Sequence, residues 1–161
     1  MGKPIAMDQV NGTLNMKTKK NSASLQFNHN FGHFVTIDAS GNVVLAVTDS
    51  TAIVGWAFSN DVAKSATAGT DDIPVNFAVD AEYIIPACAA GVAVSETTLK
   101  AALGKTCDIY TTSTTHQFAD LATGGSDSLL VTGYQYEGSA LGQQFVTVKQ
   151  NPYGISGRTG V

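Results

Sequence analysis

The sequence predicts an all-β domain: a small antiparallel β-barrel or sandwich of about eight strands, with one short helix and an extended N-terminal arm. Thr, Ser, Gly, Val and Ala are abundant, and this mixture favours strands and turns over long helices. Short apolar segments recur between groups of turn residues. A single core is expected, because a chain of 161 residues buries roughly 70 % of the surface that it exposes when unfolded.

Charge is scarce and unevenly distributed. Charged residues make up 14 % of the chain, against about 25 % in an ordinary soluble domain, so we expect partners to cover part of the surface. Residues 1–20 carry a net charge of +3, and the remaining chain carries −7. Because an acidic body repels phosphate groups and anionic lipids, neither nucleic acid nor a membrane is expected as a partner.

Residues 1–24 are polar and show no sustained period of 2 or 3.6, which predicts an extended N-terminal arm. Two interpretations of its lysines remain open: a solvated, mobile terminus, or an arm that lies on an acidic partner. The charged residues of the first twenty positions are Lys3, Asp8, Lys17, Lys19 and Lys20.

Three apolar segments follow the arm and predict an antiparallel meander. The loop between the first two is a tight hairpin in which Gly41 takes the left-handed conformation and Asp38 hydrogen-bonds back to the loop amides. In the third segment, Gly55 indicates a bulge or a close approach of another backbone. The three strands are expected over residues 34–38, 42–48 and 53–58.

Two more strands are expected after a polar loop. Val75, Phe77 and Val79 alternate with small or polar residues, so all three are expected to face the core. The strand that returns contains Pro86, which indicates a strand end, an edge or a bulge. These two strands are expected over residues 75–79 and 83–88.

One short helix is expected between strands. Ser95 is a suitable N-cap, and Glu96 suits the positive end of the helix dipole. Gly104 is expected to end the helix. One helix face carries Leu99, Ala102 and Leu103 at positions i, i+3 and i+4.

Four further strands complete the expected domain, and the last two form a pair joined by a glycine-rich loop. The tail that follows is too rich in glycine to be structured alone. The predicted division is an arm over residues 1–24, a β-barrel domain over 25–150 and a flexible tail over 151–161. The four strands are expected over residues 106–111, 117–121, 129–134 and 145–149.

The two cysteines and the lengths of the apolar segments indicate in which cellular compartment the protein is expected. Cys88 and Cys107 are flanked by apolar or small residues, which favours buried thiols, although a strand-to-strand disulfide stays open. No run approaches the roughly 20 apolar residues of a membrane helix, and residues 1–10 lack the apolar centre of a signal peptide. The chain is therefore expected to stay in the cytoplasm where it is made.

No residue is assigned a catalytic, cofactor-binding or metal-binding role. Ser126 lies in a glycine-rich turn without the pattern of a nucleophile elbow. His29 and His33 are four residues apart, but their Asn and Gly neighbours do not favour a helix that would place them together. Trp56 lies on an apolar strand and is expected in the core. We therefore expect a protein that is not an enzyme.

Residues expected to contact a protein partner lie in the arm, just after it, near the last strands and in the tail. Tyr134 and Tyr136 project from one face of a strand near its end, where they either cover the core or contact another protein. The candidate protein-interface residues are Lys17, Lys19, Lys20, Phe27, Phe31, Tyr134, Tyr136 and Tyr153.

The order of features along the chain resembles a known family. An apolar strand leads into the turn DASG at 38–41, and a Val-rich strand follows before IVGWA at 53–57. A later strand, a short helix ending in LGK at 103–105, and the final pair of strands complete the order. Over residues 34–149 the chain thus resembles the small capsid decoration, or cement, proteins of tailed bacteriophages.

This resemblance implies a small β-barrel or β-tulip domain, often a trimer, that clamps neighbouring major capsid proteins on the outer capsid surface of a virion assembled in the host cytoplasm. Added interface would hold the shell against internal genome pressure, and residues 2–24 would order on binding. The alternative is a carbohydrate- or receptor-binding β-sandwich module of a fibre or adhesin. An exposed Trp or Tyr beside Asp and Asn would favour that alternative.

Overall fold

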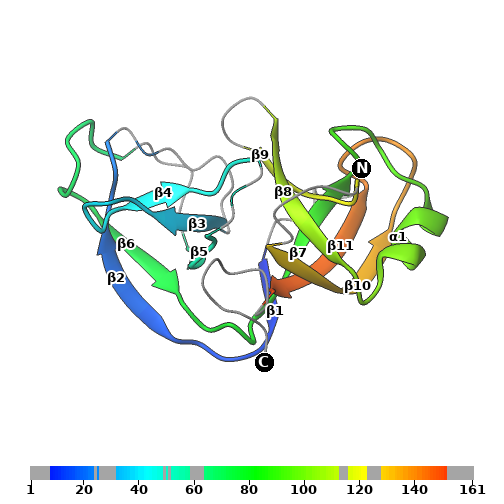
Figure 1. Ribbon diagram of the computed structural model, residues 1–161, viewed down its shortest axis with the longest axis horizontal. Helices are drawn as coiled ribbons and strands as arrows, with labels where there is room; N and C mark the ends of the chain where they lie inside the picture. Colours follow the sequence, from blue (N-terminus) through cyan, green and yellow to red (C-terminus); the bar gives the residue numbers. More distant parts are fainter. Residues whose placement is uncertain are drawn as a thin grey trace.

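A computed structural model of the protein shows two β-lobes side by side (Figure 1). In the part of the chain that it describes there are eleven strands and one helix, which confirms the all-β prediction. The described residues are 8–23, 25, 32–48, 50, 52–58, 64–112, 116–122 and 128–151.

One lobe is a closed five-stranded barrel. Its strands follow the order β7-β11-β10-β8-β9, and β9 pairs in parallel with β7 to close the ring. All other pairings in the barrel are antiparallel. The single helix, α1, packs against β10 and β11. The barrel elements are β7 Glu82–Cys88, α1 Glu96–Ala102, β8 Thr106–Thr112, β9 His116–Asp120, β10 Leu129–Tyr136 and β11 Gln144–Gln150.

The other lobe is a curved five-stranded sheet in the order β2-β6-β5-β3-β4. An isolated parallel bridge between Asn21 and Val43 connects the two ends of this sheet at one point. The lobe has its own small apolar core, which includes Val35, Ile73 and Val75. Its strands are β2 Met16–Lys20, β3 His33–Ile37, β4 Val43–Leu45, β5 Gly55–Ala57 and β6 Asp72–Asn76.

Residues 8–20, which we call the strap, connect the two lobes. Strand β1, Asp8–Asn11, pairs with β7 of the barrel, whereas β2 pairs with β6 of the sheet. The strap therefore runs antiparallel to the β6–β7 segment along both lobes (Figure 1). The expected arm is extended here, but these residues are paired within the fold. Between its two strands, Thr13 Oγ1 donates to Asp80 Oδ2 at 2.5 Å, and this bond lowers the pKa of Asp80.

Asn76 holds the strap to both lobes from a fully buried position. Its Oδ1 accepts from the backbone N–H of Asn15 at 2.8 Å and of Ala78 at 3.0 Å. Its Nδ2 donates to the carbonyl oxygen of Thr13 at 3.1 Å and to the Tyr83 hydroxyl at 3.0 Å. Because a buried amide without partners is costly, these four bonds make the side chain a structural anchor.

Gln117 and an aromatic cluster also join the lobes. From β9, the buried Gln117 accepts from the Phe34 N–H at 2.9 Å. It also donates to the Phe34 and Ala46 carbonyl oxygens, each at 2.8 Å. Trp56 stacks on Tyr83 with ring centroids 4.3 Å apart, and Phe34 meets both rings edge-on. The predicted core position of Trp56 is confirmed, because its side chain is fully buried.

All nine strands that the sequence predicted after the arm are present, with shifted ends. The Asp38 turn has the predicted hydrogen bonds, since Asp38 Oδ1 accepts from the N–H groups of Ser40 and Asn42 at 2.8 and 2.9 Å. Gly41 has a φ of 83°. A Cβ on Gly55 would collide with the carbonyl oxygen of Asn76, which confirms the expected close backbone approach.

Three details of the prediction are wrong. Strand β5 pairs with β3 and not with β4, so the first three strands are not a sequential meander. Val79 lies in the turn before β7 with an exposed fraction of 43 %, because β6 already ends at Asn76. Leu103 is also exposed, since α1 ends at Ala102 and only Leu99 and Ala102 of the expected face are buried.

Candidate functional site

The predicted interface residues lie in separate parts of the structure. The three lysines are on β2 of the sheet lobe, whereas the two tyrosines are on β10 of the barrel, so the structure does not bring the two groups together (Figure 1). The remaining three predicted residues lie outside the described part of the chain, and these are Phe27, Phe31 and Tyr153.

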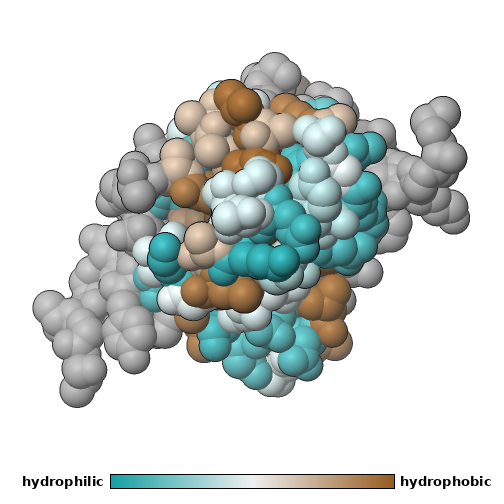
Figure 2. All heavy atoms as spheres, turned by 90° about the vertical axis from the view of Figure 1, so that its right-hand side faces the viewer, coloured by the Kyte–Doolittle hydropathy of each residue, from teal (hydrophilic) through white to brown (hydrophobic). Residues whose placement is uncertain are grey.

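The two tyrosines have different environments. Tyr134 is half-buried and packs against the barrel core, so it covers the core. Tyr136 is exposed at 39 %. Figure 2 shows that apolar residues on the face that includes this side of the barrel occur in several separate groups among polar ones. Tyr136 is therefore the more accessible of the two rings.

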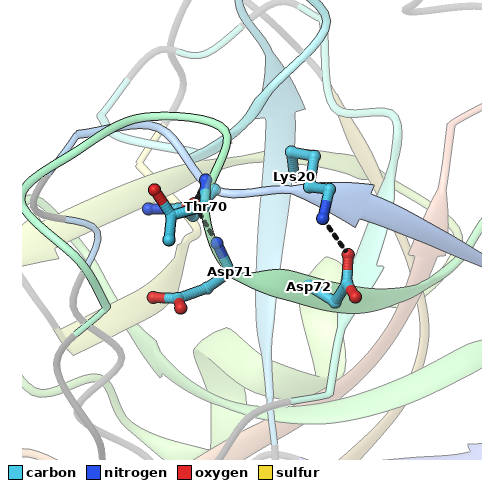
Figure 3. A network of polar contacts seen from close by, with 5 residues as sticks. Lys20, Thr70, Asp71 and Asp72 are labelled. Carbon is cyan, nitrogen blue, oxygen red and sulfur yellow. Dashed lines mark hydrogen bonds and ion pairs between the residues drawn. The ribbon is translucent and has the colours of Figure 1, made fainter.

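Strand β2 holds its three lysines in three different settings. Lys20 Nζ lies 2.7 Å from Asp72 Oδ1 in an exposed ion pair (Figure 3). Lys19 Nζ lies 5.9 Å from the ring centroid of Phe77, a distance typical of a cation–π contact. Lys17 is exposed, and no ion pair joins it to another described residue. Lys17 is therefore an exposed lysine whose charge is not neutralised by an ion pair with a described residue.

Asn21 fixes the end of β2 to the loop before β6. Its Oδ1 accepts from the backbone N–H groups of Thr70 and Asp71 at 3.0 and 2.8 Å. Figure 3 shows these two residues beside the Lys20–Asp72 pair. The Nδ2 of Asn21 donates to three carbonyl oxygens, including that of Ser65 at 3.2 Å. The sequence does not predict these hydrogen bonds of Asn21, because a buried amide and a solvated one cannot be distinguished within a polar segment.

Apolar side chains lie beside the lysines on the strap. Val10, Leu14 and Met16 are exposed at 53 %, 63 % and 43 %. Val79 is exposed on the β6–β7 turn that runs alongside. The strap thus combines basic and apolar exposed groups.

A separate groove of about 660 Å³ lies between α1 and the adjoining ends of β8 and β9. Its walls include Thr98, Lys105, Cys107, Asp108 and Leu121. Within the described residues, no group of three or more His, Cys, Asp or Glu side chains is placed to hold a metal ion. No helix in the described part of the chain is long and apolar enough to span a bilayer.

The cysteines are buried thiols with no disulfide between them, as the first of the two sequence interpretations predicted. Burial raises the pKa of the Cys88 thiol to about 11, because the thiolate would lose its hydration. Burial also raises the pKa of Tyr83 well above its usual value near 10. Both groups are therefore expected to remain protonated in the folded protein at neutral pH.

The stability of the protein is expected to fall above about pH 9, in part through Cys88. The folded thiol has the higher pKa, so its contribution is complete below the unfolded pKa near 9 and is lost as the pH rises toward 11. Urea unfolding at pH 8 and pH 10.5 measures this loss. Cys88→Ala should reduce the pH-dependent fall in the unfolding midpoint relative to the unmodified protein; an equal fall in the two proteins would contradict the assignment.

No protein-family model matches the chain. Neither a comparison with curated proteins nor one with solved structures finds a similar protein.

Proposed function

We propose that the chain is a capsid decoration (cement) protein, a structural protein that binds the outer surface of a virus shell and stabilises contacts between major capsid proteins. The observation that carries the proposal is the strap, which spans both lobes and exposes basic and apolar side chains. The β-barrel architecture and the low content of charged residues add support, as does the order of features described for residues 34–149.

In this role the protein contributes interface area and no chemistry. A protein interface of standard size buries about 1,600 Å², and a symmetric shell repeats each contact many times. The internal hydrogen bonds of Asn76 and Gln117 suit such a load, because they tie the strap and the two lobes together. We further propose a homotrimer as the form that binds the major capsid protein.

The alternative function, a carbohydrate-binding module, has less support. The feature that would favour it is an exposed Trp or Tyr beside Asp and Asn. The single Trp of the chain, Trp56, is fully buried, and the exposed Tyr136 lies opposite Gln144 in the barrel sheet. Aromatic stacking on a sugar would have to use other rings.

Electron microscopy of particles that co-purify with the affinity-tagged chain tests the proposal. We expect closed shells with the tag on their outer surface, and stripped shells that rupture at a lower temperature until the purified chain is added back. Light scattering should give three times the 16.7 kDa of one chain. Shells without the tag, or shells equally heat-resistant with and without the chain, would contradict the proposed function, and a monomeric mass would contradict the trimer.

A further inference from the structure

Strand β2 is the last strand at its end of the sheet order. Along Met16–Lys20, the only described strand that pairs with it is β6. An edge strand of this kind carries backbone N–H and C=O groups that point away from the sheet and can pair with another strand. The register with β6 determines which residues of β2 carry these groups.

Pro74 of β6 fixes that register. It lies opposite Thr18, has no N–H to donate, and turns its carbonyl oxygen toward β5, where it accepts from the Phe58 N–H at 3.0 Å. The Thr18–Pro74 pair is therefore a non-hydrogen-bonded pair of the antiparallel ladder. Two backbone hydrogen bonds, one on either side, agree with this alternation: Phe77 N–H to the Asn15 oxygen at 3.0 Å, and Asn21 N–H to the Asp71 oxygen at 3.1 Å.

Since hydrogen-bonded and non-hydrogen-bonded pairs alternate, Lys17 and Lys19 bond to β6. The backbone groups of Met16, Thr18 and Lys20 consequently point away from it. They form a series of three outward-facing residues on the free side of the strand.

Ser22 is the next residue in this outward-facing series, and its backbone already bonds to a strand of this chain. Ser22 donates its N–H to the carbonyl oxygen of Val43 at 3.0 Å, beside the parallel Asn21–Val43 bridge. Before Val43 the chain turns back to β3 through the hairpin at 38–42, so β4 does not extend along Met16–Lys20. The strand-pairing site is thus occupied at Ser22, and no other described strand covers the preceding members of the series.

We propose that the outer edge of β2 binds an extended acidic segment of a partner protein as an added strand. Lys17 and Lys19 project from one face of β2, and Lys20 projects from the other. Acidic side chains directly opposite such lysines stabilise strand pairing. Exposed Met16 and Leu14 provide apolar contacts at the same end of the strand.

Charge also selects against a second copy of this chain at the same edge. Pairing β2 with another β2 would place lysines near lysines, which destabilises strand pairing, and lysine is a common protection of natural edge strands. The inference rests on the proposed function for the existence of a protein partner, and it specifies the chemistry of the segment that binds.

Two variants separate the contributions that backbone hydrogen bonds and charge make to binding of the acidic segment. Thr18→Pro removes one outward N–H and no bond to β6, and proline is tolerated on the outer side of edge strands. Lys17→Glu reverses a charge that has no ion-pair partner among the described residues. Lys105→Glu, on an exposed lysine of the barrel lobe, is the matched control. The melting temperature of each variant verifies that it folds.

Fluorescence anisotropy with a labelled seven-residue peptide that alternates glutamate with valine measures the binding. Thr18→Pro should weaken the affinity by about tenfold, because each backbone bond contributes roughly 0.5–1.5 kcal/mol and proline also obstructs the edge. Lys17→Glu should weaken it about three- to tenfold, and Lys105→Glu should leave it unchanged. A peptide with glutamine in place of glutamate, and one with N-methyl groups on alternate amides, should each bind at least about tenfold more weakly.

Three results would overturn the inference: no binding of the acidic peptide, equal binding of the N-methylated or glutamine peptide, or equal binding by Thr18→Pro. Shells decorated equally well by Thr18→Pro and the unmodified protein would also overturn it and leave the proposed function standing. Selective peptide binding by a protein that decorates no shell would support the edge and reject the capsid role.

Discussion

Deletion of residues 1–24 is expected to abolish cooperative folding, because the strap supplies one strand to each lobe. It pairs five residues with β6 and three with β7. Each net backbone hydrogen bond contributes about 0.5–1.5 kcal/mol, whereas a whole domain is stable by about 5–15 kcal/mol. The deletion also removes two of the groups that satisfy Asn76, those of Thr13 and Asn15.

Urea unfolding followed by Trp56 fluorescence tests this expectation, since Trp56 stacks on Tyr83 between the lobes. The truncated chain should show no sigmoidal transition. A synthetic peptide of residues 8–22 should restore one, because it returns both strands and Asn21. A truncated chain that unfolds cooperatively at the original midpoint would show that the strap is dispensable.

Asn76→Ala is expected to lower the free energy of unfolding by about 4 kcal/mol, near the upper end for single substitutions. The variant loses four hydrogen bonds and leaves the Tyr83 hydroxyl and the Ala78 N–H without this partner. Each buried unsatisfied group costs about 1–3 kcal/mol. The melting temperature should therefore fall by roughly 10 °C.

Asn11→Ala is the matched control for Asn76→Ala, because the side-chain amide of Asn11 also bonds the strap to the rest of the fold but is exposed. Its side chain donates to Glu82 Oε2 at 3.0 Å, and its removal should cost about 1 kcal/mol or less. Calorimetry of both variants compares the two. Equal losses would mean that the buried hydrogen bonds of Asn76 do not hold the strap.

The sequence predicts the later strands well because local patterns specify them. Turn chemistry marks the Asp38 hairpin, and Ser95 caps α1 by accepting from the Thr98 N–H at 3.2 Å. Apolar segments identify β6 and β7 through buried residues such as Val75 and Tyr83, although the alternation places β6 three residues too late. In each case the signal lies within a few neighbouring residues.

Strand β2 of the strap cannot be predicted from the sequence because it has no buried face. Four of the five residues of β2 are exposed, and Lys19 is half-buried, so no period of 2 appears. Its pairing partners lie some fifty to sixty residues away in β6, and bonds between such distant segments leave no local pattern.

Two buried amides that join the lobes cannot be predicted from the sequence for a related reason. Asn76 and Gln117 look like solvent-facing positions, because burial of a polar side chain is rare and depends on partners elsewhere in the chain. The order of β5, β3 and β4 is likewise a property of the assembled sheet. The sequence therefore identifies the candidate surface by its lysines, whereas only the structure shows that these lysines lie on an edge strand.

Amide hydrogen exchange along β2, resolved by NMR, tests most directly the central claim that the strap is built into the fold and leaves an open strand edge. The N–H groups of Lys17 and Lys19 should exchange slowly, because they bond to β6. Those of Met16, Thr18 and Lys20 should exchange rapidly and become protected when the acidic peptide is added. Rapid exchange along the whole strand would show a detached arm, and slow exchange at Thr18 in the protein alone would show that the edge is already covered.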